Sequence, residues 1–410
     1  MKKTTKIALI GFGQRGQSLL ADAILPAGEE YNIEVAAILD TFTDRTAEGV
    51  KLVLEKTGKE PYIATDYQQI LDDPDISGVI IATSWETHVP MAIAAMKAGK
   101  YAAMEVGGAY TIEDCWKLVD THEQTGIPCM MLENCCYGKW ETMVLNMVRQ
   151  GVLGDIVHCS GGYHHDLREL MVEGEKTHHY RLSNYINRNC ENYPTHELGP
   201  IAKVLDINNG NRMVSLTSTA SCAKGLHAYI LGKEGTDSPY ANVEFSQGDL
   251  VTTVIKCAKG QTIVLTLDTT LPTAYNRAFT VRGTKASFYG ARRMIFEQGL
   301  HEEHEWDDAP LWNNAEEYFK KYAHPLWENY DPKGGHGGMD YLVISAYFES
   351  LVNGTRPPVD VYDAASWMSI TALSEESILK GSAPVMIPDF TRGKWFMKKE
   401  VTDSKYNLNR

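Results

Sequence analysis

The stretch Lys6–Gly16, KIALIGFGQRG, decides the fold of this chain. An apolar run ends on Gly11, and Gly13 and Gly16 follow in G-x-G-x-x-G spacing before the helix-like residues 17–24. Gly11 permits a sharp turn, Gly13 lets the backbone come close to a pyrophosphate, and Gly16 lets helix and strand pack closely. The amides at the helix N-terminus would then face the phosphates. The pattern predicts a strand, a tight turn and a helix that together bind a dinucleotide.

A second apolar run, Ile33–Leu39, ends on Asp40, about 20 residues beyond the glycines. An acidic residue at this place can hold the ribose hydroxyls of adenosine and would repel a 2′-phosphate. NAD is therefore favoured over NADP as the cofactor. The alternative is a glycine turn in an α/β domain that binds no nucleotide, with Asp40 acting as a helix cap.

Short apolar runs alternate with amphipathic segments up to about residue 130. The expected strands are 79–82, 101–104 and 128–132, and the expected helices are 86–98 and 112–125. This alternation, with a glycine fingerprint at the first crossover, predicts a doubly wound parallel sheet. Ligands bind at the carboxyl ends of such strands. The stretches at those ends are Thr83–His88, Glu105–Val106 and Glu133–Asn134.

From about residue 155 the pattern becomes rich in strands. The expected strands are 156–163, 213–223, 241–245, 249–257, 262–269 and 279–282, and helices are expected near 197–207, 338–352 and 364–380. Strands with few helices between them favour a mostly antiparallel sheet. The polar stretch 296–335 is expected to form a surface excursion or lid.

The chain is therefore expected to be an α/β protein with two domains. Residues 1–135 would form a Rossmann domain that binds NAD. Residues 136–410 would form an α+β domain with a large open, mostly antiparallel sheet, which serves substrate binding and oligomerisation. Packing of the C-terminal segment back onto the first domain is left open.

Composition excludes several classes of partner. The 410 residues carry a net charge of −14, which argues against a nucleic-acid or anionic-membrane surface. The eight cysteines form no C-x-x-C pair and several lie in apolar runs, so free thiols in a reducing compartment are expected. No apolar window is long enough to span a bilayer. We expect a cytoplasmic protein, or an exported one if a targeting peptide has been removed.

A nucleotide-binding half followed by an open antiparallel sheet resembles the Gfo/Idh/MocA oxidoreductase family. Dehydrogenases of that family usually carry E-K-P after the fifth strand, and the lysine takes part in proton transfer. Here the corresponding residues are Glu105, Val106 and Gly107, without a lysine. This difference disfavours a plain sugar dehydrogenase.

Further motifs extend to the C-terminal end of the sequence. They are TSWETH at 83–88, MEV at 104–106, LENCCYG at 132–138, VLNMVRQG at 144–151, GGYHHDLR at 161–168, YPTHELGP at 193–200, DINNGNR at 206–212, KGLHAYI at 224–230, GHGGMDY at 335–341 and IPDFTRGKW at 387–395. Together they resemble one branch, glycoside hydrolase family 109, the NAD-dependent α-N-acetylgalactosaminidases.

The resemblance implies a set of cofactor and sugar contacts. The cofactor contacts, besides Gly11, Gly13 and Gly16, are Gln14, Arg15, Asp40, Trp85, Glu86, Thr87, His88, Glu105, Val106, Asn134 and Tyr193. The sugar contacts are Tyr163, Arg181, Tyr193, Pro194, Thr195, His196 and Tyr275. His336 is added as a substrate-site member, because the glycines around it suit close backbone approach to a ligand. The segment 168–181 is shorter than the corresponding loop of the family. Because that loop would lie beside the sugar pocket, its length affects which sugar is bound.

The implied chemistry is an oxidative route to glycoside cleavage. Ordinary glycosidases use two carboxylates, and no such pair occurs among the matched positions. The resemblance implies that NAD⁺ takes a hydride from sugar C3, that loss of the C2 proton expels the C1 substituent, and that water and the hydride are then added back. His196 is the first choice for proton work because an imidazole titrates near neutral pH. Tyr193 and Tyr163 are second choices, if a cation such as Arg181 lowers the tyrosine pKa.

Three alternatives stay open. One is a sugar dehydrogenase that releases NADH, another is a related glycosidase with a different sugar specificity, and the third is a non-catalytic protein that binds NAD and a sugar. A small-molecule or glycan substrate is expected. By analogy with the family, a homo-oligomer is also expected.

Some residues admit a structural explanation. Glu133 could pair with an arginine or move a proton. His164 and His165 are adjacent and lack the i, i+4 spacing of helical metal ligands, so no metal is expected. Trp306, Trp312 and Trp327 are better explained as packing in a lid than as sugar platforms.

Overall fold

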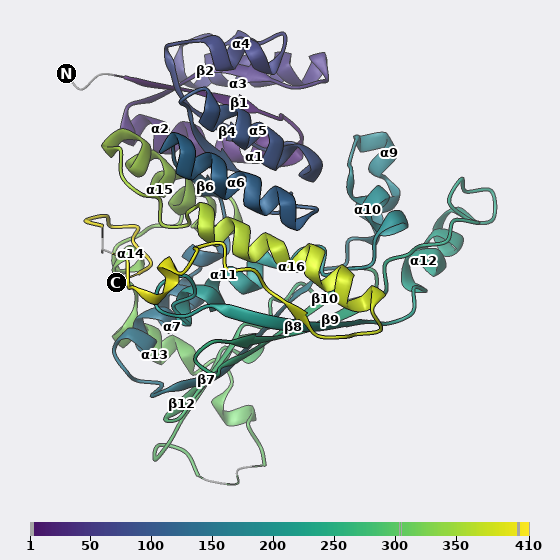
Figure 1. Ribbon diagram of the computed structural model, residues 1–410, viewed down its shortest axis with the longest axis vertical. Helices are drawn as coiled ribbons and strands as arrows, with labels where there is room; N and C mark the ends of the chain where they lie inside the picture. Colours follow the sequence, from purple (N-terminus) through teal and green to yellow (C-terminus); the bar gives the residue numbers. More distant parts are fainter. Residues whose placement is uncertain (1–3, 303, 305, 400–401, 410) are drawn as a thin grey trace. The chain divides into compact units, whose positions relative to one another are not determined.

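The computed structural model describes residues 4–302, 304, 306–399 and 402–409, which fall into two compact units (Figure 1). The first unit takes its residues from 1–138, 325–365 and 399–410, and the second from 139–324 and 366–398. Segments late in the chain thus belong to the first unit. The division of function after residue 135 stays a prediction.

The first unit is built on a six-stranded sheet in the order β3-β2-β1-β4-β5-β6. The strands are β1 (Thr5–Ile10), β2 (Ile33–Leu39), β3 (Tyr62–Ile63), β4 (Ile76–Ile81), β5 (Tyr101–Met104) and β6 (Cys129–Met131). All five strand pairs are parallel. The strand order reverses between β1 and β4, which confirms the predicted doubly wound sheet.

Helices follow most strands of this sheet. They are α1 (Gln14–Leu19), η1 (Leu20–Ile24), α2 (Leu25–Tyr31), α3 (Thr43–Thr57), α4 (Tyr67–Asp72), α5 (Trp85–Lys97), α6 (Ile112–Thr125) and η2 (Asn134–Tyr137), and later in the chain α14 (Pro325–Glu328), η5 (His336–Gly338) and α15 (Met339–Asn353). The helical run after the glycine turn extends from residue 14 to residue 31. It is longer than predicted because the π-helical turn η1 precedes Pro26, whose missing N–H needs no acceptor at the start of α2.

The second unit contains an eight-stranded sheet in the order β13-β12-β11-β7-β10-β9-β8-β14. The strands are β7 (Ile156–His164), β8 (Met213–Ala220), β9 (Leu250–Cys257), β10 (Thr262–Asp268), β11 (Thr280–Gly283), β12 (Ala286–Tyr289), β13 (Met294–Glu297) and β14 (Val385–Met386). Among the strand pairs described, β7 and β10 run parallel and the others antiparallel. The predicted open, mostly antiparallel sheet is confirmed.

Helices cover one face of this second sheet, as the alternating burial along β9 and β10 requires. The helices of the unit are α7 (Lys139–Arg149), α8 (Arg168–Val172), α9 (Gly174–Thr177), α10 (Arg181–Asn187), α11 (Thr195–Val204), α12 (Gly225–Glu234), η3 (Gly290–Arg292), η4 (Ala309–Leu311), α13 (Ala315–Tyr322), α16 (Val361–Leu379, from residue 366) and η6 (Lys394–Phe396). Helix α11 packs on β7, and Ser377 of α16 accepts a hydrogen bond from the N–H of Ser218 in β8 (2.8 Å).

Two expectations need correction, the strand at 241–245 and the packing of Trp306. The predicted strand 241–245 is a turn and loop, because Pro239 precedes two successive turns in which Ala241 donates to Ser238 (3.0 Å) and Val243 to Tyr240 (3.1 Å). The stretch 296–335 holds the short helices η4, α13 and α14. Trp327 is buried, in agreement with the packing interpretation, whereas Trp306 is 98% exposed, which contradicts it.

None of the helices in the described part of the chain combines the length and the apolar character that crossing a bilayer demands.

Candidate functional site

The glycine turn joins β1 to α1, and its three glycines differ in whether the surrounding protein leaves space for a side chain. A Cβ on Gly11, whose φ is +90°, would lie 2.5 Å from the carbonyl oxygen of Ala82, and a Cβ on Gly16 would lie 2.1 Å from that of Gly11. Packing of the protein itself therefore demands these two glycines. Gly13 has an ordinary φ of −71°, and the atom nearest to its Cβ position is Nη1 of Arg45 at 3.6 Å. Glycine at residue 13 thus leaves space beside the backbone that the protein itself does not fill. Such space is expected where the backbone receives a pyrophosphate.

Asp40, at the end of β2, holds this turn in place. Its Oδ2 accepts the backbone N–H of Phe12 (2.6 Å) and its Oδ1 that of Phe42 (2.9 Å). Helix α3 begins at Thr43 with Phe42 as its N-cap residue, so Asp40 is not the helix cap of the alternative interpretation. The acidic residue and the glycine turn are thus in direct contact, and together they fit the adenosine and pyrophosphate part of NAD.

The side chain of His88 lies between the segments that follow β4 and β5 and contacts both. Its ring nitrogens lie 3.0 Å from the carbonyl oxygen of Thr83 and 3.3 Å from that of Gly107. Burial outweighs these carbonyls and lowers the pKa of His88, which keeps the ring neutral. Trp85 is also buried, and a Cβ on Gly107 would lie 2.8 Å from its Nε1. The side chains of His88 and Trp85 therefore shape the loop after β5.

Two further predicted cofactor residues lie in the first turn of α5. Glu86 is exposed, and the Thr87 hydroxyl hydrogen-bonds to the hydroxyl of Thr83 (2.7 Å) and the carbonyl of Ser84 (2.8 Å). Gln14 begins α1, directly after the glycine turn that follows β1. All of these residues occupy the carboxyl edge of the parallel sheet, where a dinucleotide is expected.

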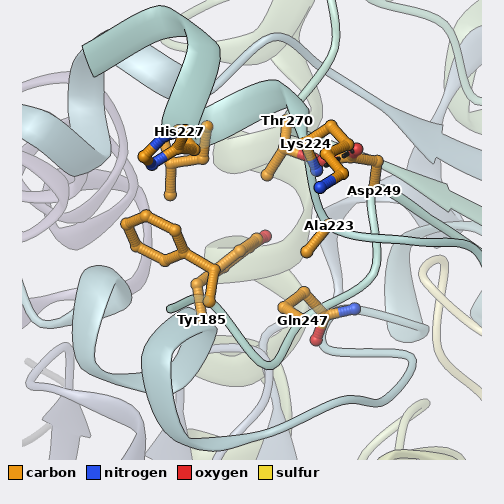
Figure 2. A pocket seen from close by; sticks show the side chains of 9 residues that line it. Tyr185, Ala223, Lys224, His227, Gln247, Asp249 and Thr270 are labelled. Carbon is orange, nitrogen blue, oxygen red and sulfur yellow. Dashed lines mark hydrogen bonds between the residues drawn. The ribbon is translucent and has the colours of Figure 1, made fainter. Parts of the chain in front are cut away.

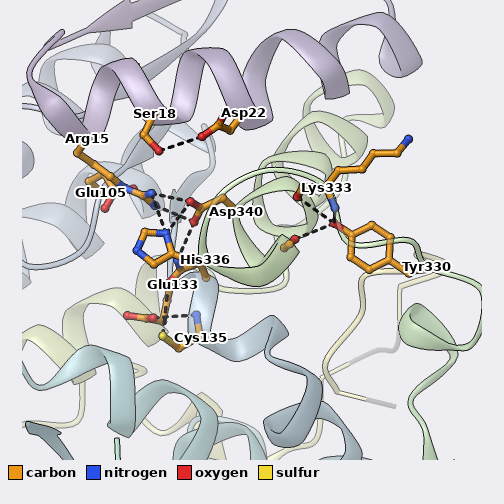
Figure 3. A network of polar contacts seen from close by, with 12 residues as sticks. Arg15, Ser18, Asp22, Glu105, Glu133, Cys135, Tyr330, Lys333, His336 and Asp340 are labelled. Atoms are coloured by element: carbon orange, nitrogen blue, oxygen red, sulfur yellow. Dashed lines mark hydrogen bonds and ion pairs between the residues drawn. The ribbon is translucent and has the colours of Figure 1, made fainter. Parts of the chain in front are cut away.

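A polar network centred on the buried Asp340 joins several predicted site residues at the same edge (Figure 3). Arg15 pairs with Glu105 through its Nε (2.9 Å). It also forms a two-pronged pair with Asp340, at 2.7 Å to Oδ2 and 3.0 Å to Oδ1. Asn134 donates to Asp340 Oδ1 (2.7 Å), and Nδ1 of His336 donates to Oδ2 (2.8 Å). Sequence reasoning missed Asp340, although it lies in the motif GHGGMDY.

The predicted sugar residues of the second unit form an aromatic cluster. Its centre is Tyr163 on β7, whose ring centroid lies 4.6 Å from that of Tyr193 and 5.6 Å from that of His196. The rings of Tyr193 and His196 are 4.8 Å apart, and the guanidinium carbon of Arg181 lies 4.7 Å from the Tyr193 ring. Tyr275 approaches Tyr163 at 6.3 Å and is 52% exposed. The structure therefore brings together the side chains that the resemblance assigns to the sugar.

Local structure explains how this cluster is presented. Tyr193 and Pro194 end a loop and Thr195 begins α11, so His196 lies in the first turn of that helix. Pro194 and Thr195 are buried, whereas His196 is half-buried. Tyr163 and Tyr193 are 6% and 7% exposed, so mainly His196 and Tyr275 offer surface to a ligand.

His165 belongs to the cluster but was missed as a sugar residue. Its Nδ1 shares a hydrogen bond of 3.0 Å with the Tyr163 hydroxyl, and its ring lies 5.0 Å from Tyr275. The alternation of side chains along β7 could have placed it on the same face as Tyr163.

Glu191, just before the cluster, is fully buried. Its backbone N–H donates to the hydroxyl of Ser374 (2.8 Å), and its carbonyl accepts from Thr371 (3.0 Å), so α16 holds this residue in place. Burial raises the pKa of Glu191 to about 8, against the opposing effect of the Tyr193 backbone N–H. A buried carboxyl group with a raised pKa thus lies two residues from Tyr193.

A separate small cavity lies beside α12 (Figure 2). Its lining residues are Tyr185, Ala223, Lys224, Leu226, His227, Phe245, Gln247, Asp249 and Thr270. The Asp249 carboxylate accepts the N–H of Lys224 (2.7 Å), the N–H of Gly225 (3.0 Å) and the Thr270 hydroxyl (2.7 Å). These bonds satisfy the helix start, and no predicted site residue lines the cavity.

Two family models match the chain. Residues 5–132 match the oxidoreductase family NAD-binding Rossmann fold, and residues 137–397 match the glycosyl hydrolase 109 C-terminal domain. Together the matches cover both the glycine turn and the aromatic cluster.

Curated relatives agree with the second of these models. An alpha-N-acetylgalactosaminidase of Tannerella forsythia is 38% identical over 420 residues, covering 96% of this chain and 88% of the relative. A glycosyl hydrolase family 109 protein of Parabacteroides distasonis is 41% identical over 357 residues, covering 82% and 75%.

Solved structures share the fold at low identity. A levoglucosan dehydrogenase in complex with NADH and levoglucosan superposes with a TM-score of 0.68 at 19% identity, covering 94% of this chain and all of the other. An apo scyllo-inositol dehydrogenase of Lactobacillus casei gives a TM-score of 0.63 at 14% identity, covering 94% and 99%.

Proposed function

Because the chain belongs to glycoside hydrolase family 109 and carries the NAD-binding Rossmann domain of the Gfo/Idh/MocA oxidoreductases, we propose that it releases terminal α-linked N-acetylgalactosamine from glycans. The name of the relative from Tannerella forsythia supports this sugar and linkage. NAD is the cofactor of the family and of the Rossmann domain, and the glycine turn with Asp40 fits it.

The observation that carries the proposal is the composition of the aromatic cluster. Tyrosine rings, two imidazoles and one guanidinium can stack on a sugar and move protons. They do not supply the acid and nucleophile carboxylates of an ordinary glycosidase. When bound, NAD supplies a reversible oxidation at sugar C3, which acidifies the C2 proton so that the C1 substituent can leave before water and the hydride are added back.

His196 is assigned to proton transfer at sugar C2 or at the C3 hydroxyl. It is half-buried, and its ring contacts both Tyr193 and Tyr163, so it can reach a ligand while its position is fixed. An imidazole nitrogen can accept and return a proton near neutral pH. Tyr193 and Tyr163 are the second choices for this role.

Arg181 and His165 support the two tyrosines. Arg181 is 8% exposed and places a fixed positive charge over the ring of Tyr193, which favours negative charge on that phenol. His165 can exchange a proton with the Tyr163 hydroxyl across their hydrogen bond.

Val106 argues against a net sugar dehydrogenase. It stands where dehydrogenases of the family usually carry a lysine, and it is apolar and only 2% exposed. A valine cannot move a proton, so the proton transfer that accompanies net oxidation would lack its usual group.

The proposal is tested with a panel of α- and β-linked aryl glycosides of N-acetylgalactosamine, galactose and glucose, with and without added NAD⁺. We expect turnover of the α-linked N-acetylgalactosamine substrate without accumulation of NADH. His196→Ala should abolish it, whereas His227→Ala, which removes a half-buried histidine from the separate cavity, should retain it.

Other outcomes would contradict the proposal. Stoichiometric NADH formation from free sugar would show a dehydrogenase, and turnover of another glycoside would show a different specificity. Sugar binding without any turnover would show a non-catalytic binding protein.

A further inference from the structure

Asp340 is the centre of the polar network in the first unit, and its carboxylate is fully buried. It lies in the first turn of α15 and is 0% exposed. Arg15, Asn134 and His336 all donate to it, at 2.7–3.0 Å. Both carboxylate oxygens are therefore used, and Oδ1 and Oδ2 each accept two hydrogen bonds.

The partners of Asp340 come from distant parts of the chain. Arg15 is the second residue of α1, and Asn134 is the first residue of η2 after β6. Arg15 and Asp340 are 325 residues apart in sequence. Asp340 joins the Arg15 and Asn134 side chains through its own two carboxylate oxygens. Asp340 thus sets the orientation of one predicted cofactor residue relative to another.

A glycine-rich loop encloses the carboxylate. Gly334, His336, Gly337 and Gly338 all have φ between +52° and +93°. A Cβ on Gly335 would lie 2.6 Å from Asp340 Oδ2, and one on Gly334 would lie 2.4 Å from the carbonyl oxygen of Asp22. Glycine at these two places lets the loop pass closely over the carboxylate and over η1. This close passage explains Gly334 and Gly335, and it brings Nδ1 of His336 to 2.8 Å from Asp340 Oδ2.

We propose that Asp340 is a positioning residue for NAD, which acts by fixing the side chains of Arg15 and Asn134 and does not touch the cofactor. The inference rests on the assignment of those two residues to NAD. A two-pronged carboxylate holds a guanidinium in one plane, and Asn134 on the same carboxylate is held at a fixed place beside it. Glu105 restrains the same guanidinium through Nε.

The charge of Asp340 is constant under working conditions. Burial alone would raise its pKa, but the hydrogen bonds from His336 and Arg15 outweigh this effect and hold the pKa well below its ordinary range. Asp340→Asn therefore removes the charge and one pair of acceptor sites while nearly preserving the shape of the side chain.

The test is a double-mutant cycle on NADH binding by the full chain. The variants are Asp340→Asn, Arg15→Met and the double variant, and the dissociation constant is measured by NADH fluorescence. We expect Asp340→Asn to weaken binding about tenfold, near the middle of the range for changes that act on a ligand through another residue. In the Arg15→Met background the same change should weaken binding by less than about twofold, because its route to the cofactor is gone.

Asp363→Asn is the matched control. Asp363 is also an acidic residue in the first turn of a helix, is 1% exposed, and pairs with Lys399 at 3.8 Å instead of with a cofactor residue. It should lower the melting temperature without changing NADH affinity. A purely structural role for Asp340 would give the same behaviour as this control and would overturn the proposal, as would equal losses in both backgrounds.

A second variant covers the case in which Asp340→Asn does not fold. Gly335→Ala displaces the carboxylate without deleting it, since the added methyl group would lie 2.6 Å from Oδ2. The same loss of NADH affinity is expected, again absent with Arg15→Met, and unchanged affinity would refute the proposal. These measurements involve no glycoside, so a failure of the proposed sugar specificity would leave their outcome unaffected.

Discussion

Replacing Gly13 with alanine separates what the protein needs from what the cofactor needs. The backbone at Gly13 has a φ of −71°, which alanine adopts without strain, and the Cβ position lies 3.6 Å from the nearest atom, Nη1 of Arg45. The free energy of unfolding of Gly13→Ala should therefore stay the same or rise by about 0.5 kcal/mol, because alanine has less freedom than glycine in the unfolded chain.

NADH affinity should respond in the opposite way. A methyl group at residue 13 would fill the space through which the backbone approaches the pyrophosphate. We expect the dissociation constant to rise by at least about tenfold, which is about 1.4 kcal/mol. Urea denaturation and NADH fluorescence titration measure the two quantities on the same preparation.

Gly16→Ala is the contrasting variant. Its Cβ would lie 2.1 Å from the carbonyl oxygen of Gly11, which is backbone and cannot turn aside. Stability should fall by about 2–3 kcal/mol, as expected of an overpacked site. If Gly13→Ala bound NADH as tightly as the wild type, the pyrophosphate would not lie at this turn. If it unfolded as easily as Gly16→Ala, the room beside residue 13 would not exist.

Three other variants test separate parts of the account. Burial raises the pKa of Glu191 to about 8 from 4.5, so the contribution of this carboxyl group to stability is fully present below pH 4.5 and is lost as the pH rises to 8. Glu191→Gln should therefore melt above the wild type at pH 8.5 and lose this advantage toward pH 4.5, by about 1.4 kcal/mol per pH unit. A difference that does not depend on pH would contradict this. Asp40→Ser removes the carboxylate that would repel a 2′-phosphate. The ratio of NADPH affinity to NADH affinity, measured in parallel titrations, should therefore rise at least about tenfold. An unchanged ratio would contradict this. Arg277→Met leaves the buried Glu141 without the guanidinium 2.6 Å away and should lower the free energy of unfolding, measured by urea denaturation, by about 3 kcal/mol. Adding Glu141→Gln should restore part of this loss in the double variant. If Arg277→Met lost no stability, the pair would contribute nothing.

The sequence was sufficient where a segment's own residues decide its structure. Strands β2 and β5 and helix α6 have the predicted bounds. Both strands are mostly apolar, with Glu34 as the charged exception in β2, as expected for a parallel sheet covered on both faces. Helix α6 begins where Thr111 accepts the N–H of Asp114 (3.1 Å) and ends where Gly126 takes a φ of +70°.

Long-range contacts are what sequence reasoning could not supply. Asp340 looks like any acidic residue in a first helical turn, and only the fold brings Arg15 to it from 325 residues away. His336 was predicted to be a substrate residue, and the structure places its Nδ1 on Asp340; its role toward a sugar stays a prediction. The failure at 241–245 is local instead, because the turns that follow Pro239 direct the backbone N–H groups of Ala241 and Val243 to Ser238 and Tyr240.

The site as a whole was predicted in different ways for its two parts. The glycine turn and Asp40 follow from spacing and chemistry alone, because a pyrophosphate and a ribose impose both. The cluster around Tyr163 and His196 came from the family resemblance, since aromatic residues scattered over more than a hundred positions carry no local pattern. Its members do lie together in the structure.

The most direct test of the central claim is hydrolysis of an α-linked aryl N-acetylgalactosaminide by the wild-type holoenzyme in heavy water, with the released sugar analysed by NMR. Transient oxidation at C3 predicts that the product carries deuterium at C2, keeps its original hydrogen at C3 and forms without net NADH. A product that retains its hydrogen at C2 would contradict the oxidative route.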